Sequence, residues 1–215
     1  MKFHRKKILS WLKYALSIAT PLLLQHAALA ACRMEPNAQC QGAMLKNVNW
    51  KNADVGAGDF RDANLEGANL EGTRLRGADL RGANLKSARL LRSDLTDATL
   101  EKADLSGANL KHASLARSRL IGANMSKSFL DWADLSGAFL DHANLTRSHL
   151  VGADLHQANL RDARLDGAFL NYANLKQAKL GGASMQRTRM IDARLSEAEW
   201  TDGRVCRAGA VGWCE

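Results

Sequence analysis

The side chains best suited to bind a metal ion are four histidines, His112, His142, His149 and His156. Imidazole nitrogen is a common zinc ligand, but a zinc site needs three or four ligands that converge on one point. Whether these histidines converge depends on the elements that position them. Acidic residues are also plentiful, yet they recur within a short repeat, as turn residues and solvated surface residues do.

Catalytic motifs do not accompany these residues. The sequence contains no Gly-rich phosphate loop, no zinc-spaced set of cysteines and no nucleophile motif. We therefore predict that the protein is not an enzyme and uses no metal or other cofactor. An enzyme with a site that the sequence does not display is a remote alternative.

The first 30 residues have the features of a secretory signal peptide. A basic region at 2–7 precedes an apolar stretch from Tyr14 to Leu24, and Ala28-Leu29-Ala30 fits the small-x-small cleavage pattern. The apolar stretch is shorter than the roughly 20 residues that span a bilayer. Gln25 and His26 then interrupt it, which argues against an uncleaved membrane anchor. We expect an exported protein, periplasmic or secreted.

Four cysteines bear on the same question. Cys32 and Cys40 are separated by eight positions near the N-terminus, as are Cys206 and Cys214 near the C-terminus. An even number of cysteines in an exported chain favours two disulfides. Residues 29–32 also resemble a lipobox, in which a lipidated Cys32 would tether the protein to a membrane, but that would leave three thiols. Soluble export with two disulfides is favoured.

The formal charge of +8 comes largely from the signal segment. Residues 1–30 hold five basic residues and no acidic ones, so the rest of the chain has 25 basic and 22 acidic residues and a charge of +3. So small a charge does not predict a basic surface for nucleic acid.

Apolar side chains occupy every fifth position from Leu45 to Trp200. All 32 of these central positions are apolar and 25 are Leu, while the position two before the centre is Ala in 24 pentads. On a helix, a period of five would distribute the apolar side chains all around the axis, and on a strand it would place them alternately on two faces. The chain must therefore turn after each pentad, so that four pentads close a square coil with the central side chains inside.

The other positions of the pentad agree with a turn. Asn or Asp precedes the centre in 16 of the 32 pentads, and Gly follows it by two positions in ten. Short polar side chains hydrogen-bond to nearby backbone, and glycine relieves tight turns. Thirty-two pentads make eight coils, which at about 4.8 Å per coil form a rod about 38 Å long.

Segments such as Ala63-Asn64-Leu65-Glu66-Gly67 and Ala108-Asn109-Leu110-Lys111-His112 resemble the A-[DN]-L-x-x unit of the pentapeptide-repeat family. The resemblance covers about three quarters of the chain. It implies an all-β solenoid, a right-handed quadrilateral β-helix with short parallel strands or bridges on each face. We place this β-helix at 43–200, between an N-terminal cap at 31–42 and a C-terminal cap at 201–215.

The ends of a solenoid need covers, because terminal coils expose apolar centres and unpaired backbone. Large residues suit the ends, with Trp50, Val55 and Phe60 in the first coil and Trp200 in the last. Val205, Val211 and Trp213 are expected to cover the last coil. Each cysteine pair is expected to fix one cap, because a rod about 38 Å long separates its ends beyond the ~7 Å reach of a disulfide.

The coil also sorts the surface residues into columns. The four histidines fall in different columns, so we predict no metal site. The best-known members of the family mimic DNA and protect DNA gyrase, which needs an acidic track. One outward column of this chain is mixed in charge: Asp54, Arg74, Asp94, Ser114, Asp134, Asp154, Asn174 and Arg194.

One outward feature departs from this polar pattern. Phe169 follows Phe129 by two full coil periods, so the two rings share a face, while Phe139 falls on the opposite face. Gly152 is expected to leave a shallow gap between two rings on this face. The predicted partner-binding patch consists of Phe129, Trp132, His149, Val151, Phe169 and Tyr172.

The sequence thus favours a non-catalytic structural or protein-binding scaffold in an exported compartment. Its expected partner is another protein or a second copy of the chain, with no nucleic acid. No contact with a membrane is expected beyond the signal peptide, unless Cys32 is lipidated. The alternative is an inhibitor that acts by DNA-like mimicry.

Overall fold

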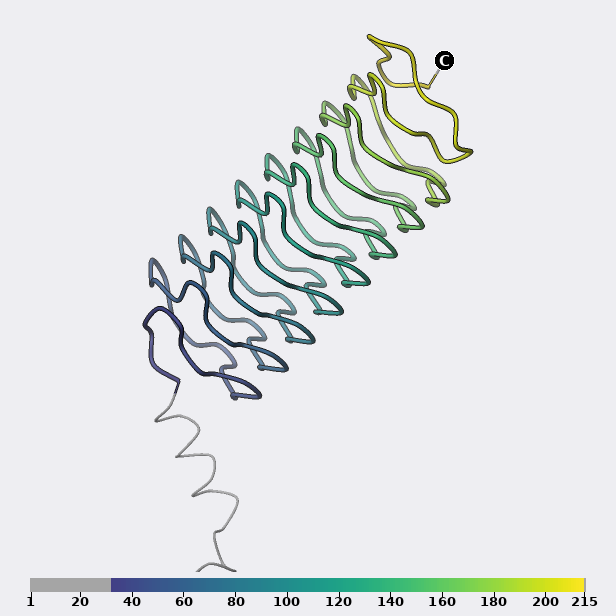
Figure 1. Ribbon diagram of the computed structural model, residues 1–215. Helices are drawn as coiled ribbons and strands as arrows, with labels where there is room; N and C mark the ends of the chain where they lie inside the picture. The colour runs from purple at the N-terminus through teal and green to yellow at the C-terminus, as the bar shows by residue number, and fades with distance from the viewer. Residues whose placement is uncertain (1–31, 215) are drawn as a thin grey trace, which may run out of the picture.

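The computed structural model describes residues 32–214, which form one rod of stacked coils. Figure 1 shows the coils following one another from the purple N-terminal end to the yellow C-terminal end. The predicted signal peptide and its cleavage site lie outside the described residues.

Neither a helix nor an extended strand occurs in residues 32–214, and so none of these residues belongs to a helix that could cross a membrane. Single-residue parallel bridges join the coils instead, each from one pentad to the fourth pentad after it, from Gln39↔Asp59 to Lys179↔Glu199. Bridges recur at every fifth residue, so four pentads complete a coil and each coil has four sides. This confirms the square coil that the period of five predicts.

Pentads in the body of the rod repeat one set of backbone hydrogen bonds. The N–H of Leu65 donates to the carbonyl of Asn84 in the next coil (2.7 Å), and the N–H of Asn64 donates to Ala43 in the previous one (2.9 Å). The N–H of Ala68 donates back to Leu65 (3.0 Å) and closes a β-turn, whose third residue, Gly67, has a φ of 65°. Positive φ at that position is typical of a type II turn, so glycine there has the conformational role that we predicted.

Polar residues before the centre stabilise the same corner. The side-chain oxygen of Asn64 accepts a hydrogen bond from the N–H of Glu66 (3.2 Å), and that of Asp104 accepts one from Ser106 (2.9 Å). Amides of neighbouring coils also bond to one another, as Asn84 does to Asn64 (3.2 Å). The predicted hydrogen bonds from short polar side chains to nearby backbone are confirmed.

The core is a continuous ladder of central residues. Leucines in the middle of the rod and the alanines beside them are fully buried, and burying each Leu side chain contributes about 1.5–3 kcal/mol before ordering entropy is subtracted. Where Ser replaces the inward Ala, its hydroxyl can donate to the carbonyl of the preceding centre. Ser93 bonds to Leu90 (2.8 Å) and Ser148 to Leu145 (2.7 Å) in this way.

The repeat geometry begins one pentad before the boundary predicted at residue 43. Cys40 is buried at a central position, and the bridge from Gln39 continues the ladder. A disulfide joins Cys40 to Cys32, with the two Cα atoms 4.7 Å apart. In the adjoining pentads, the rings of Trp50 and Phe60 pack edge to face, with their centroids 5.7 Å apart. Large rings therefore seal the N-terminal coil, as predicted.

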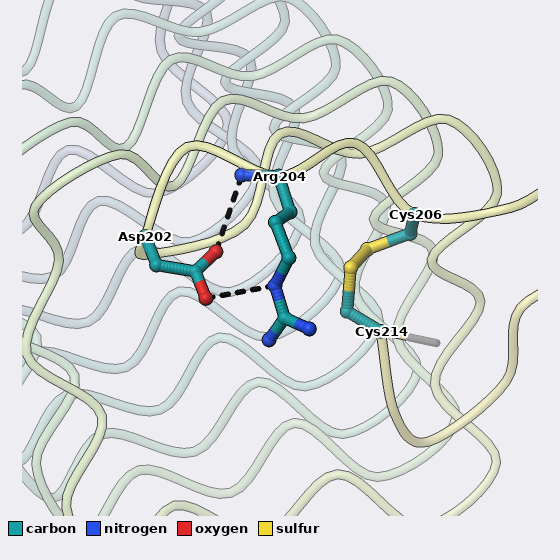
Figure 2. The surroundings of a disulfide bond; sticks show 4 residues. All are labelled: Asp202, Arg204, Cys206 and Cys214. Carbon is teal, nitrogen blue, oxygen red and sulfur yellow. Dashed lines mark hydrogen bonds and ion pairs between the residues drawn. A yellow bond between two sulfur atoms is a disulfide. The ribbon is translucent and has the colours of Figure 1, made fainter.

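The C-terminal cap turns back over the last coil. Its backbone makes antiparallel bridges, Glu199↔Val205 and Arg194↔Val211, and Figure 2 shows the disulfide between Cys206 and Cys214 in this cap. In the same view the carboxylate of Asp202 accepts hydrogen bonds from the backbone (3.1 Å) and the guanidinium (2.8 Å) of Arg204. The backbone bond lowers the pKa of Asp202 below its ordinary value.

The expectation that Val205, Val211 and Trp213 cover the last coil with their side chains is wrong for Val205 and Val211, while Trp213 only borders a cavity beside Met185 and Met190. The exposed fractions of Val205, Val211 and Trp213 are 66%, 53% and 76%. Val205 and Val211 pair with residues whose side chains point outward, so their own side chains point outward as well. The cover consists instead of the cap backbone and the buried Cys206.

Candidate protein-binding face

Three rings of the predicted patch form one stack. Phe129 bridges to His149 and His149 to Phe169, and their ring centroids are 5.2 Å and 4.7 Å apart with tilted planes. The coil spacing thus sets the ring spacing, within the roughly 4.5–7 Å that aromatic pairs prefer. The predicted alignment of Phe129 and Phe169 in one column is confirmed.

A cation closes each end of this stack. The ammonium of Lys111 lies 5.6 Å from the ring centre of Phe129, and the guanidinium of Arg189 lies 5.2 Å from that of Phe169. Such cation–π contacts contribute about 0.5–1 kcal/mol each at exposed sites. Sequence reasoning missed both cations, although Arg189 follows Phe169 by one coil period and the column rule therefore places it there.

Trp132 and Tyr172 stand at the corner of the same coils, and each is 58% exposed. Gly152 occupies the same position of the coil that lies between the coils of Trp132 and Tyr172. A Cβ atom built on Gly152 would come within 2.5 Å of the Trp132 ring. The indole therefore lies over Gly152, and the predicted gap between the two rings is wrong. The side chain of Trp132 is long enough to reach one coil further, and Gly152 has no side chain to prevent it.

The remaining aromatic and apolar residues fall where their columns place them. Val151 is half-buried, and its N–H donates to the carboxylate of Asp131 (3.3 Å). Phe139 lies in a different column between Arg119 and Asn159, where the Arg119 guanidinium is 5.7 Å from its ring. Phe139 is therefore not part of the patch, as predicted.

The histidines occupy separate settings. His149 lies within the ring stack, His156 contacts the carbonyl of Lys176 through Nδ1 (3.0 Å), and Nδ1 of His142 is 4.0 Å from Asp162. His112 is at an exposed turn with positive φ. Over residues 32–214 no group of three or more His, Cys, Asp or Glu side chains is arranged to hold a metal ion.

Several acidic side chains outside the patch form ion pairs with arginines. A hydrogen bond from Arg81 lowers the pKa of Asp79, and one from Arg117 in the next coil lowers that of Asp97. The bridges also confirm the column that runs from Asp54 to Arg194, which mixes four aspartates, two arginines and two neutral residues. This column is not the continuous acidic track that a mimic of DNA needs.

The face thus combines aromatic rings with flanking cations on a rod of stacked coils. Comparisons with known proteins identify the repeat that builds this rod. The family model described as pentapeptide repeats matches residues 59–97, 93–131, 130–167 and 170–199. No curated protein matches the chain.

Several solved structures resemble the chain. HetL, a pentapeptide repeat protein involved in heterocyst differentiation regulation from the cyanobacterium Nostoc sp. strain PCC 7120, is 32% identical. The match covers 85% of this chain and 97% of HetL, with a TM-score of 0.38.

A pentapeptide repeat protein from the thylakoid lumen of Arabidopsis thaliana is 28% identical over 49% of this chain and 81% of its own, with a TM-score of 0.45. QnrB1, a plasmid-mediated fluoroquinolone resistance protein, is 18% identical over 72% of this chain and 89% of its own, with a TM-score of 0.40. With the family model matching more than half of its residues, the chain belongs to the pentapeptide-repeat family.

Proposed function

We propose that this chain is a non-catalytic protein-binding scaffold, built on a right-handed quadrilateral β-helix and acting in an exported compartment, periplasmic or secreted. The observation that carries this proposal is the ring stack Phe129–His149–Phe169 beside the exposed Trp132 and Tyr172. Aromatic side chains are enriched at the centres of protein interfaces. The partner is another exported protein or a second copy of the chain.

Exposure and rigidity both support this assignment. Three of the four large apolar side chains exposed between positions 45 and 190 lie on this face: Phe129, Trp132 and Tyr172. Their backbone is held by the bonds between coils, as in Trp132 N–H to Val151 (3.0 Å) and Tyr172 N–H to Ile191 (2.8 Å). A surface ordered before binding loses little conformational entropy when a partner arrives.

Replacing Trp132 and Tyr172 together with Ser is expected to abolish partner capture or self-association and to leave the fold intact. Neither residue occupies a central position, and both are exposed, so their loss opens no cavity in the core. The measurement is a pull-down from the exported compartment together with sedimentation of the purified protein.

Phe139→Ser is the matched control, because it removes an exposed ring from the opposite face. It is expected to leave partner capture unchanged. Equal recovery of partners by the wild type and the double variant, with the same monomer–dimer balance, would count decisively against this face.

Inhibition by DNA-like mimicry has less support. The column from Asp54 to Arg194 contains both signs of charge, and arginines from neighbouring coils pair with acids elsewhere, as Arg117 does with Asp97. A mimic of DNA would instead repeat unpaired negative charge along one face.

Export leads to a separate prediction about the mature protein. Cleavage after Ala30 would give a chain that starts at Ala31, and both disulfides would leave no free thiol, as in residues 32–214 of the structure. Intact mass with and without alkylation measures both features. A diacylglyceryl adduct on Cys32, or a thiol that alkylates without prior reduction, would contradict soluble export.

A further inference from the structure

The C-terminal cap covers only part of the last coil. Cap backbone pairs with the pentads centred on Leu195 and Trp200, through Leu195 N–H to Ala210 (2.8 Å) and Trp200 N–H to Arg204 (2.6 Å). The two preceding pentads, centred on Met185 and Met190, receive no such cover from the described residues. Half of the last coil therefore has an open edge.

This edge presents unused backbone groups in the order that a further coil would use. Among the described residues, nothing accepts a hydrogen bond from four N–H groups of these two pentads, those of Met185, Arg187, Met190 and Asp192. The carbonyls of Ala183 and Thr188 likewise accept none from the described chain. In the coil below, the equivalent groups are paired, as in Leu165 N–H to Ser184 (2.7 Å) and Leu170 N–H to Arg189 (2.7 Å).

An apolar cavity of about 520 Å³ adjoins the open edge. Met185, Met190, Ile191, Trp200 and Trp213 contribute to its lining. Met185 and Met190 are only half-buried, whereas the central leucines in the middle of the rod are fully buried. Methionine adapts to ligands of different shape, so these two centres suit the packing of an incoming apolar side chain.

The two uncovered pentads hold Arg187, Arg189 and one acid, Asp192, so the edge has a net positive charge that favours an acidic occupant. Its unused donors outnumber its unused acceptors, and Arg189 is the charged residue in the cavity lining. No ion pair involves Arg187 or Arg189 in the part of the chain that the structure describes. A carboxylate on the occupant would complement this side of the rod.

We propose that this open half-coil binds a short segment of a partner polypeptide, at a site that adjoins the protein-binding face through Arg189 and Ile191. The segment has two extended pieces joined by a β-turn, each with one bulky apolar side chain, and an acidic residue between or beside them. Backbone in this form is what pairs with the equivalent groups of Leu165 and Leu170 one coil below. The added piece extends an existing sheet edge, a common mode of peptide recognition.

The probe is the capped, fluorescein-labelled peptide Ala-Asp-Leu-Ser-Gly-Ala-Asn-Leu, which copies residues 103–110. It contains one turn, two leucines and one acid. Fluorescence polarisation is expected to show saturable binding to the full mature chain. The peptide carrying Leu105→Lys and Leu110→Lys is expected to bind at least about tenfold more weakly, because it loses both apolar contacts.

Variants of the protein locate the site. Met190→Asp and Trp213→Ser are each expected to weaken peptide binding at least about tenfold, while circular dichroism and the melting temperature verify that they fold. Met44→Asp is the matched control, since Met44 is 62% exposed at the other end of the rod. The Trp132→Ser and Tyr172→Ser double variant is also expected to bind the peptide normally, which separates this site from the proposed protein-binding face.

Three outcomes would overturn the proposal. The first is an absence of saturable binding by the wild type, and the second is equal binding by the folded Met190→Asp and Trp213→Ser variants. The third is a concentration-dependent dimer that Met190→Asp dissolves, in a protein that does not bind the peptide. That result would assign the open edge to a second copy of the chain.

Discussion

Replacing Leu110 with Lys is expected to prevent the solenoid from folding. Leu110 is fully buried, and its neighbours along the ladder, Leu90 and Leu130, are apolar as well. An ammonium there would have no partner and no route to solvent through four closed sides. We expect the substitution to lower the free energy of unfolding by more than about 4 kcal/mol. That is a large part of the roughly 5–15 kcal/mol by which a typical domain is stable. Leu115→Lys is expected to behave alike.

Far-UV circular dichroism and thermal melting measure this effect, with Ser106→Lys as the control. Ser106 lies at a turn, its backbone N–H bonds to Asp104, and its side chain is partly exposed. Its replacement is expected to be nearly silent. If Leu110→Lys kept a native β-type spectrum and melting temperature, the inward assignment of the central residues would be wrong.

Replacing both Cys206 and Cys214 with Ser is expected to release the C-terminal cap. The disulfide holds the Cα atoms of these two cysteines 4.7 Å apart. It thereby restrains the cap segment that pairs with Leu195 and Trp200. Removing a native disulfide costs about 2–5 kcal/mol in small secreted domains. Amide hydrogen exchange at Leu195, Glu197 and Trp200 is expected to accelerate strongly, because their N–H groups donate to cap carbonyls.

The Cys32→Ser and Cys40→Ser pair is the matched control at the other end of the rod. Repeats of a solenoid interact mainly with their nearest neighbours, so this control is expected to loosen the N-terminal coil and leave exchange at Leu195 unchanged. Unchanged protection of Leu195 and Trp200 in the Cys206→Ser and Cys214→Ser variant would show that the cap holds without its disulfide.

The repeat made much of the fold and part of the face predictable. Period five with no insertion fixes which residues face inward and which share a column, so the burial of Leu110 and the alignment of Phe129, His149 and Phe169 followed from arithmetic. The direction of a long side chain does not follow from a column. For this reason the position of the Trp132 ring over Gly152 was missed.

The ends were less predictable, because residues 201–214 carry no repeat. Their antiparallel pairing with Glu199 and Arg194 depends on how a non-repetitive segment reverses direction. No periodic signal states that Val205 points outward or that the pentads of Met185 and Met190 stay uncovered. The cysteine count, by contrast, constrained both ends, and both predicted pairings are present.

The uninterrupted register has a consequence for how genes of this kind can change length. One whole coil is the interval between bridged residues. Gain or loss of one whole coil would lengthen or shorten the rod by one coil and leave every surface residue in its column. Gain or loss of a single pentad would rotate all later residues by a quarter turn. An indel of one pentad between Phe129 and His149 would thus send His149 and Phe169 to the adjacent side while leaving every core leucine inside. Surface columns are therefore preserved only when the chain gains or loses whole coils, whereas the buried core is preserved when it gains or loses any whole number of pentads.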